Sequence, residues 1–230
     1  MKRRLFVLFV TFVVLLFSQN TRAGAKAANV YHKIETDNSE KKIALTFDDG
    51  PHPRITREII SILKEYGVTA TFFVIGQNAD NYPDTMKLLA ESGYEIGNHT
   101  YSHKNLKKMS EDEVVEEFRR CNETLLKFGV EPNLMRPPEG FFTDDVIKVS
   151  STMEYDIILW SIDTRDWAHT PSECIVKNVL ENAKSGDIIL MHDYLSGYGG
   201  TCEALRIIIP ELAHRGFEFV TVSELIGENA

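Results

Sequence analysis

Short apolar runs alternate with amphipathic segments from Lys42 almost to the end of the chain. The run 43–47 has the length and composition of a buried strand, whereas the apolar residues of 55–66 recur every three or four positions, as on one face of a helix. Gly67 ends that helix. The same reasoning predicts further strands at 68–75, 94–96, near Leu134, and at 157–162, 188–191 and 217–220, and further helices at 84–92, 111–128, 144–153, 172–183 and 202–213.

This alternation repeats about seven times, and most connections are too long for hairpins. Such a pattern favours a parallel sheet, either open or closed into a barrel. A length of 230 residues leaves room for one sizeable domain with its own core. The residues with reactive side chains follow the predicted strands, and in a β/α barrel these positions gather at one rim. We therefore predict a single-domain α/β barrel with its active site at the C-terminal ends of the strands.

The N-terminal segment has the three parts of a secretory signal peptide. A basic start at Lys2 to Arg4 precedes an apolar run from Leu5 to Phe17, and small residues follow at Ala23, Gly24, Ala25 and Ala27. The apolar run is shorter than the roughly 20 residues of a membrane-spanning helix, although the segment could instead stay as an uncleaved anchor. We predict a signal peptide at 1–25, a linker at 26–41 and a catalytic domain at 42–226, secreted or held at the cell surface.

The net charge narrows the classes of partner. Cleavage after Ala25 would remove four basic residues and no acidic one, which changes the formal charge from −9 to −13. Such a surface argues against nucleic acid and anionic lipid as partners, so contact with a membrane is expected only through an N-terminal anchor. A neutral or amino-bearing sugar polymer remains open as a partner.

Two adjacent carboxylates, Asp48 and Asp49, follow the first predicted strand, before Gly50-Pro51. Their mutual repulsion is unfavourable unless a metal ion or an arginine offsets it. Taken alone, however, the sequence Asp-Asp-Gly is better explained as an acidic turn in solvent. The pair indicates a metal site only if other ligands lie near it.

His99 and His103 supply such ligands, four residues apart, after the predicted strand 94–96. On one helical turn this spacing directs both imidazoles to the same side, as in metal-binding histidine pairs. With Asp49 they would supply two nitrogens and one oxygen and leave positions open for water and substrate, as in a catalytic zinc site. Two histidines at this spacing are about as often ordinary surface or core residues as they are metal ligands. Here the position of the pair directly after a strand favours ligands.

Three further groups follow later strands. The segment 136–140, Arg-Pro-Pro-Glu-Gly, is either a rigid surface turn with a solvated arginine or a rim turn whose arginine holds a carboxylate ionised. The segment from Trp160 to Trp167 contains two aspartates, Asp163 and Asp166. His192 follows the strand 188–191, where it is either a satisfied core residue or, paired with an aspartate, a general acid.

Taken in order, the motifs T-F-D-D-G, H-T-x-x-H, R-P-P-x-G, D-x-x-D-W and L-x-H-D occur between Lys42 and Leu225. Each is weak alone, but five in this order are specific, and they resemble the polysaccharide deacetylase family of carbohydrate esterases, also called the NodB homology family. Members resemble a distorted (β/α)7 barrel. The resemblance implies a metal-dependent hydrolase of carbon–nitrogen bonds that releases acetate from N-acetylated polysaccharide, such as peptidoglycan or chitin-like N-acetylglucosamine chains.

The resemblance also implies how the metal and the attacking water would be held. Asp49, His99 and His103 would bind one divalent metal, with zinc as the expected ion. Asp48 would be the general base that deprotonates the attacking water, and Arg136 would pair with Asp48 and keep it charged.

The remaining motif residues would act on the leaving group and the sugar. His192 would be the general acid, with Asp166 hydrogen-bonded to it, although Asp163 is an alternative partner. Glu139, Gly140 and Trp167 would contact the substrate, and the Glu139 backbone N–H would face the oxyanion.

Several features leave the substrate open. Many members of the family carry an aromatic residue where this chain has Glu139, which puts the sugar preference in doubt. An O-deacetylase of xylan would use the same site, and an inactive cell-wall-binding relative would keep the fold without turnover. Loops around the groove, such as Leu195 to Gly200, would select the polymer.

Overall fold

The computed structural model describes residues 28–36, 40–194 and 200–227. The expected signal peptide, 1–25, and nearly all of the expected substrate loop, 195–200, lie outside these residues. Within them, no helix combines the length and the apolar character needed to cross a membrane.

The strands of the described residues form one sheet of nine strands. Along the sheet the order is β1-β6-β5-β4-β3-β2-β8-β7, with β9 paired to β2, and all of these ladders are parallel. The strands are β1 Val30–Tyr31, β2 Lys42–Asp48, β3 Thr71–Val74, β4 Glu95–Asn98, β5 Leu134–Met135, β6 Asp156–Ile158, β7 Ile162–Asp163, β8 Ile188–His192 and β9 Glu218–Phe219.

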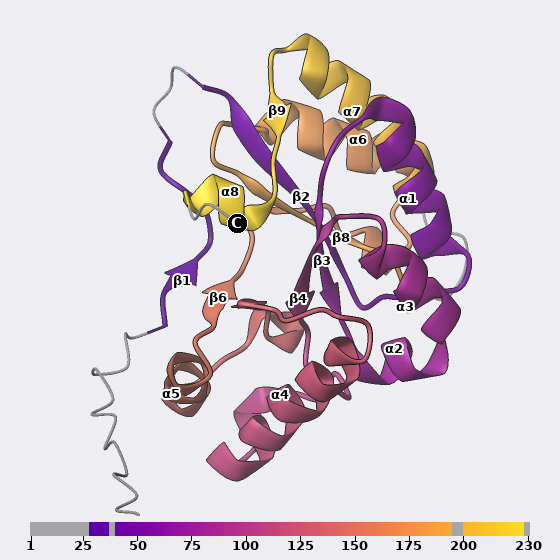
Figure 1. The fold of residues 1–230 in the computed structure, drawn as a ribbon. Helices are drawn as coiled ribbons and strands as arrows, with labels where there is room; N and C mark the ends of the chain where they lie inside the picture. The colour runs from indigo at the N-terminus through magenta and orange to yellow at the C-terminus, as the bar shows by residue number, and fades with distance from the viewer. Residues whose placement is uncertain (1–27, 37–39, 195–199, 228–230) are drawn as a thin grey trace, which may run out of the picture.

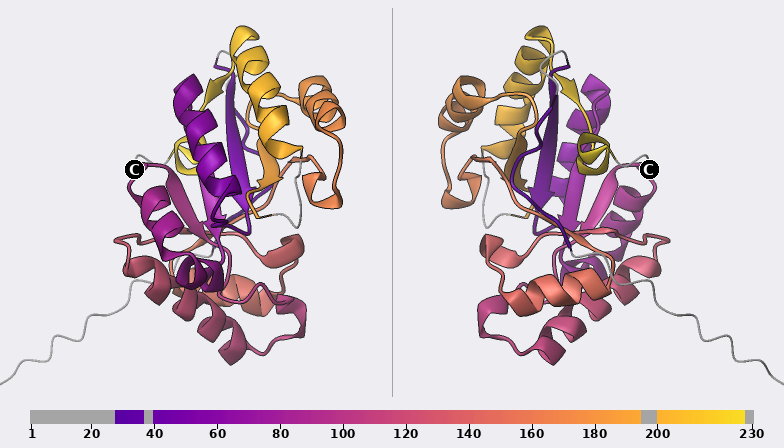
Figure 2. Two further views of the ribbon diagram at one scale, coloured as in Figure 1. Left: turned by 90° about the vertical axis from the view of Figure 1, so that its right-hand side faces the viewer. Right: turned by 90° about the vertical axis from the view of Figure 1, so that its left-hand side faces the viewer.

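Helices cover the outer side of this curved sheet (Figure 1). Helices α1, α6 and α7 lie side by side, and α4 contacts both α2 and α5 (Figures 1 and 2). The α-helices are α1 Ile55–Tyr66, α2 Gly76–Asn81, α3 Pro83–Ala90, α4 Glu111–Leu126, α5 Asp144–Thr152, α6 Ser172–Asn182, α7 Thr201–His214 and α8 Val222–Ile226, and the 3-10 helices are η1 Leu106–Lys108, η2 Pro138–Gly140 and η3 Asp166–Ala168.

Strand side chains alternate between the helix layer and the barrel interior. In β2, Leu45 and Phe47 belong to the large apolar cluster that includes the outer helices, whereas Ala44 belongs to a smaller inner cluster. Because side chains on a strand alternate with a period of two, Asp48 shares the inner face with Ala44. The parallel register pairs Asp48 with His192 of β8. The sheet thus brings two of the expected catalytic residues together at the C-terminal ends of neighbouring strands.

The strand expected at 157–162 is in fact two short strands, β6 and β7, in different parts of the sheet. The Leu159 N–H donates to the Tyr31 carbonyl in β1 (2.7 Å), whereas the Ser161 N–H donates to the Ile188 carbonyl in β8 (3.0 Å). The chain therefore changes partners from one end of the strand order to the other between Leu159 and Ser161, which distorts the barrel. The predicted α/β barrel is confirmed, but the prediction of one continuous strand was wrong.

Several short elements, among them β1 and α2, were not expected from the sequence. Within the range 26–41, expected as a linker, β1 pairs with β6, and the Asn29 side chain donates to Asp156 (2.8 Å). The helix α2 has the sequence GQNADN, which has no apolar periodicity from which a helix could be predicted.

Candidate active site

The turn after β2 holds two carboxylates in different environments. Asp48 ends β2 and is buried inside the barrel. Asp49 follows in the left-handed region (φ 78°), which a non-glycine residue keeps only where surrounding contacts hold it. The Asn78 side chain donates to the Asp49 carbonyl (2.7 Å), and the Ile75 N–H donates to the Gly50 carbonyl (3.0 Å). These bonds tie the turn to Ile75, which joins β3 to α2, and to α2 itself.

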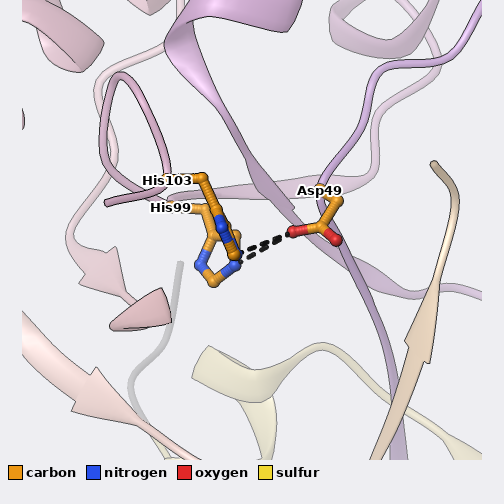
Figure 3. A group of neighbouring side chains, drawn as sticks. All are labelled: Asp49, His99 and His103. Carbon is orange, nitrogen blue, oxygen red and sulfur yellow. Dashed lines mark ion pairs between the residues drawn. The ribbon is translucent and has the colours of Figure 1, made fainter. Parts of the chain in front are cut away.

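The side chain of Asp49 faces two imidazoles (Figure 3). Its Oδ1 atom lies 3.3 Å from His99 Nε2 and 3.2 Å from His103 Nε2. The three ligand atoms lie within 4.8 Å of one another, and in the described ranges no other group of three or more His, Cys, Asp or Glu side chains has this spacing. The residues expected as metal ligands therefore converge.

The segment 99–103 is not the helical turn expected from the histidine spacing. His103 is in the left-handed region (φ 53°), which is incompatible with an α-helix. The N–H groups of Tyr101 and Ser102 donate to the buried carboxylate of Glu117 in α4 (3.1 and 2.8 Å). The helical interpretation was wrong, because this carboxylate holds the segment as a loop, but the loop still directs both imidazoles toward Asp49.

The donors around Asp49 fit a bound cation. His99 Nδ1 lies 2.7 Å from the Arg136 carbonyl, which can only accept, so Nδ1 carries a proton and Nε2 is available as a ligand. Asp49 Oδ1 is buried and has no hydrogen-bond partner among the described residues. Burial lowers the pKa of His99, but the charges of Asp48 and Asp49 outweigh it and raise the pKa, so the site favours an added positive charge. Two nitrogens and one carboxylate oxygen are a donor set that zinc accepts.

Arg136 lies inside the barrel and has no exposed surface. Its Nη1 donates to Asp48 Oδ1 (2.7 Å) and to the Thr46 hydroxyl (2.8 Å), both on β2. Its Nε and Nη2 donate to the carbonyls of Ile158 (3.1 Å) and Leu159 (2.9 Å). The alternative of a solvated surface arginine is therefore wrong, and the guanidinium joins the base candidate Asp48 to the end of β6.

His192 and Asp166 form a second buried pair. Asp166 Oδ1 lies 2.7 Å from His192 Nδ1, and Oδ2 accepts from the His192 N–H and the Thr201 hydroxyl, both at 2.8 Å. Asp163, the alternative partner, instead accepts from the Arg165 N–H (2.8 Å). Burial lowers the pKa of His192, but the hydrogen bond and charge of Asp166, together with the charges of Asp48 and Asp49, outweigh it and raise the pKa to about 9. The imidazolium form therefore predominates at neutral pH.

These groups share one cavity of about 400 Å³ at the C-terminal ends of the strands. A substrate in this cavity would meet both carboxylates of the turn, both imidazoles of the loop and His192. The lining residues are Asp48, Asp49, His99, His103, Glu139, Trp160, Asp163, Trp167, Leu190 and His192.

The residues expected to bind substrate are not equivalent. Glu139 lines the cavity in a left-handed conformation (φ 58°), and its backbone N–H meets no acceptor among the described residues. Trp167 also lines the cavity, and half of its surface (51%) is exposed. Gly140 does not line it. A Cβ atom on Gly140 would lie 2.8 Å from the Trp160 ring, so the glycine makes room for that ring.

Sequence reasoning did not identify Trp160, Leu190 or Glu117 as site residues. Leu190 lies two residues before His192 on β8, so the strand period places it on the same face and could have identified it. Trp160 lies two residues after the end of β6, a position that was hidden because one long strand was expected there. Nothing in the local pattern connects Glu117 with a loop 15 residues earlier.

Comparisons with known proteins agree with this geometry. The model of the family described as polysaccharide deacetylase matches residues 35–158. The chain is 42% identical over 198 residues to a peptidoglycan-N-acetylglucosamine deacetylase of Bacillus cereus, covering 85% of this chain and 93% of that protein. It is 39% identical to the peptidoglycan-N-acetylmuramic acid deacetylase PdaC of Bacillus subtilis, covering 84% of this chain and 40% of that protein.

A solved structure is similar over nearly the whole domain. The Bc1960 peptidoglycan N-acetylglucosamine deacetylase, in complex with 4-naphthalen-1-yl-N-oxidanyl-benzamide, superposes with a TM-score of 0.83 at 37% identity. The match covers 88% of this chain and 94% of that chain.

Proposed function

Because this chain belongs to the polysaccharide deacetylase family, we propose that it hydrolyses N-acetyl groups of peptidoglycan or chitin-like N-acetylglucosamine chains and releases acetate. The observation that carries the proposal is the convergence of Asp49, His99 and His103 beside the buried pairs of Asp48 and His192 in one cavity. A substrate outside the cytoplasm agrees with the export signal expected in residues 1–25.

The cation expected in this site is zinc, held by Asp49 Oδ1 and the two imidazole Nε2 atoms. When bound, a divalent cation supplies Lewis acidity toward the acetyl carbonyl and toward the attacking water. The protein contributes the geometry, because the left-handed turn at Asp49 and the loop at 99–103 orient the ligands before any substrate arrives.

Asp48 is the general base in this proposal. Its Oδ1 is engaged by Arg136, and its Oδ2 lies 3.8 Å from His99 Nε2, on the side where the attacking water would sit. Arg136 pairs with the carboxylate and orients it, so Asp48 can take the proton of the water as the water adds to the acetyl carbon. The Glu139 N–H is free to donate to the oxyanion that forms there.

His192 is the general acid in this proposal. An amide expels its amine only when the nitrogen is protonated, and His192 is an imidazolium at neutral pH because of Asp166. With Nδ1 engaged by Asp166, Nε2 is the nitrogen that remains to donate a proton into the cavity. Trp167, half exposed at the rim, offers an aromatic face to the sugar.

Metal removal tests the proposal directly. We expect acetate release from N-acetylglucosamine oligomers to fall to background after treatment with a chelator and to return when zinc is added. Acetylated xylan in parallel separates N- from O-deacetylation. Release that is unaffected by chelation would contradict the metal site, release from acetylxylan alone would favour the O-deacetylase, and tight oligomer binding without release would favour a wall-binding protein.

The variant Asp166→Asn should move the alkaline limb of the pH profile of kcat/KM. The general acid is active in its protonated form, so activity is lost as pH rises through the pKa of His192. In the wild-type protein that pKa is raised to about 9 by Asp166. Asp166→Asn removes the largest contributions that raise this pKa, whereas burial, which lowers it, and the smaller effects of the Asp48 and Asp49 charges remain, so the limb should move to lower pH. A limb at the ordinary value of 6.5 would correspond to a loss of roughly 30-fold at pH 8.

Thr201→Val is the matched control for this profile, because it removes one hydrogen bond to Asp166 and leaves the charge in place. It should move the limb much less than Asp166→Asn does. An alkaline limb at the same pH in Asp166→Asn and wild type would exclude His192 as the acid that Asp166 supports.

A further inference from the structure

Asp193 is a buried residue with no role in the proposed mechanism. It follows His192 directly, is 1% exposed and does not line the cavity. Its N–H donates to the Asp48 carbonyl (3.1 Å). Its Oδ2 accepts from the Thr56 hydroxyl in the first turn of α1 (2.6 Å). Asp193 therefore contacts elements on both sides of the turn that carries Asp49.

The Asp193 carboxylate also fills the space beside Gly50. A Cβ atom on Gly50 would lie 2.1 Å from Asp193 Oδ2 and 2.3 Å from Oδ1. Beyond Gly50, the His52 N–H donates to the Thr56 hydroxyl oxygen (2.7 Å). The same hydroxyl group donates to Asp193. The Asp193 side chain, directly after β8, thus packs on the middle of the turn and, through Thr56, on its end.

The position of this turn decides where the Asp49 carboxylate points. Asp49 is left-handed, and such a conformation persists only when its surroundings over-determine it. His99 and His103, which face Asp49, come from a different loop, held by Glu117. The distance between Oδ1 and the imidazoles therefore depends on what fixes the turn relative to that loop.

We propose that Asp193 is a positioning residue that sets the affinity for the divalent cation, because it holds the turn 49–52 so that Asp49 stays opposite the two imidazoles. This inference rests on the proposed metal site and adds a residue that neither binds the ion nor touches substrate. Residues that orient metal ligands typically change affinity by about 10- to 100-fold when removed.

Asp187 provides a matched control next to the opposite end of β8, because it directly precedes that strand as Asp193 directly follows it. It lies near the start of β8, is 4% exposed, and accepts from Lys33 Nζ (2.8 Å) and the Ser161 hydroxyl (2.9 Å). Asp187→Ala therefore removes a buried, hydrogen-bonded aspartate of similar burial far along β8 from the turn. A purely structural role for Asp193 predicts that both alanine variants behave alike.

The test is zinc affinity, measured by competition with a chromophoric chelator on the folded, metal-free proteins, beside their thermal unfolding. We expect Asp193→Ala to raise the zinc Kd by about 10- to 100-fold, and Asp187→Ala to lower the unfolding temperature with an unchanged Kd. Thr56→Val, which removes only the hydroxyl, should raise the Kd by a smaller factor and serves if Asp193→Ala does not fold. An unchanged Kd in Asp193→Ala or Thr56→Val, or an equal rise in Asp187→Ala, would overturn the proposal.

A second measurement tests the contact with Gly50. Gly50→Ala should itself weaken zinc binding, because its Cβ collides with the Asp193 carboxylate. In the double variant Gly50→Ala/Asp193→Ala the collision is gone, so its Kd should be no higher than that of Asp193→Ala alone. Additive weakening would overturn the contact. If the wild-type protein bound no zinc, both the proposed function and this inference would be contradicted. If Asp193→Ala bound zinc with the wild-type Kd, only the inference would be contradicted.

Discussion

Replacing Asp48 with asparagine is expected to lower kcat by about a thousandfold while zinc content stays at the wild-type level. An amide cannot take the proton of the attacking water, so the general-base contribution disappears. Asp48 is not one of the three ligands, and its nearest approach to His99 Nε2 is 3.8 Å. The measurement is the rate of acetate release at a saturating concentration of one substrate, together with the metal content of the same preparation, determined by emission spectroscopy.

His99→Ala is the counterpart that separates chemistry from metal binding. It removes a ligand and should lose both zinc and turnover, whereas Asp48→Asn should lose only turnover. The asparagine can still accept one hydrogen bond from Arg136, so the variant should remain folded, with a lower unfolding temperature because the buried guanidinium has lost its counter-charge. Turnover at the normal rate in Asp48→Asn would exclude this carboxylate as the base.

The barrel and the place of its active site could be predicted because they depend on local periodicity. The apolar strands and amphipathic helices alternate along the chain, and parallel strands bring their C-terminal ends to one rim. Asp48, His99 and His192 each end or follow a strand, so their convergence follows from topology before any side-chain contact is known. The convergence of residues that lie at strand ends can therefore be predicted from the order of strands and helices along the sequence.

The conformation of the histidine loop could not be predicted, because a distant residue decides it. The spacing of His99 and His103 suits a helix, yet Thr100 and His103 are left-handed. The Glu117 carboxylate from α4 accepts from the N–H groups of Tyr101 and Ser102 and holds this loop. The Asn98 side chain also accepts from the Thr100 N–H (2.7 Å), which turns the chain immediately after β4. Tertiary hydrogen bonds thus override a local spacing rule.

The change of partners after β6 was hidden for a related reason. The sequence from Ile157 to Ile162 is largely apolar and reads as one strand. Only the hydrogen bonds of Leu159 and Ser161, to different ends of the strand order, show that the chain changes partners there. At this change of partners the carbonyls of Ile158 and Leu159 accept hydrogen bonds from Arg136.

Arg136→Met is therefore expected to destabilise the protein by about 3–5 kcal/mol, because it leaves the Asp48 carboxylate buried without its counter-charge. The substitution also leaves the carbonyls of Ile158 and Leu159 without the hydrogen bonds that they accept from the guanidinium in the wild-type protein. The free energy of unfolding, from urea titration followed by circular dichroism, measures the loss.

The double variant Arg136→Met/Asp48→Leu separates the charge from the remaining hydrogen bonds. With both charges replaced by apolar side chains, most of the stability should return, since removing a whole buried pair is far less harmful than removing one partner. Catalysis should stay absent, because the base is gone. If the single and double variants were equally unstable, the hydrogen bonds to β6, and not the pairing with Asp48, would be the reason that an arginine occupies the centre of this barrel.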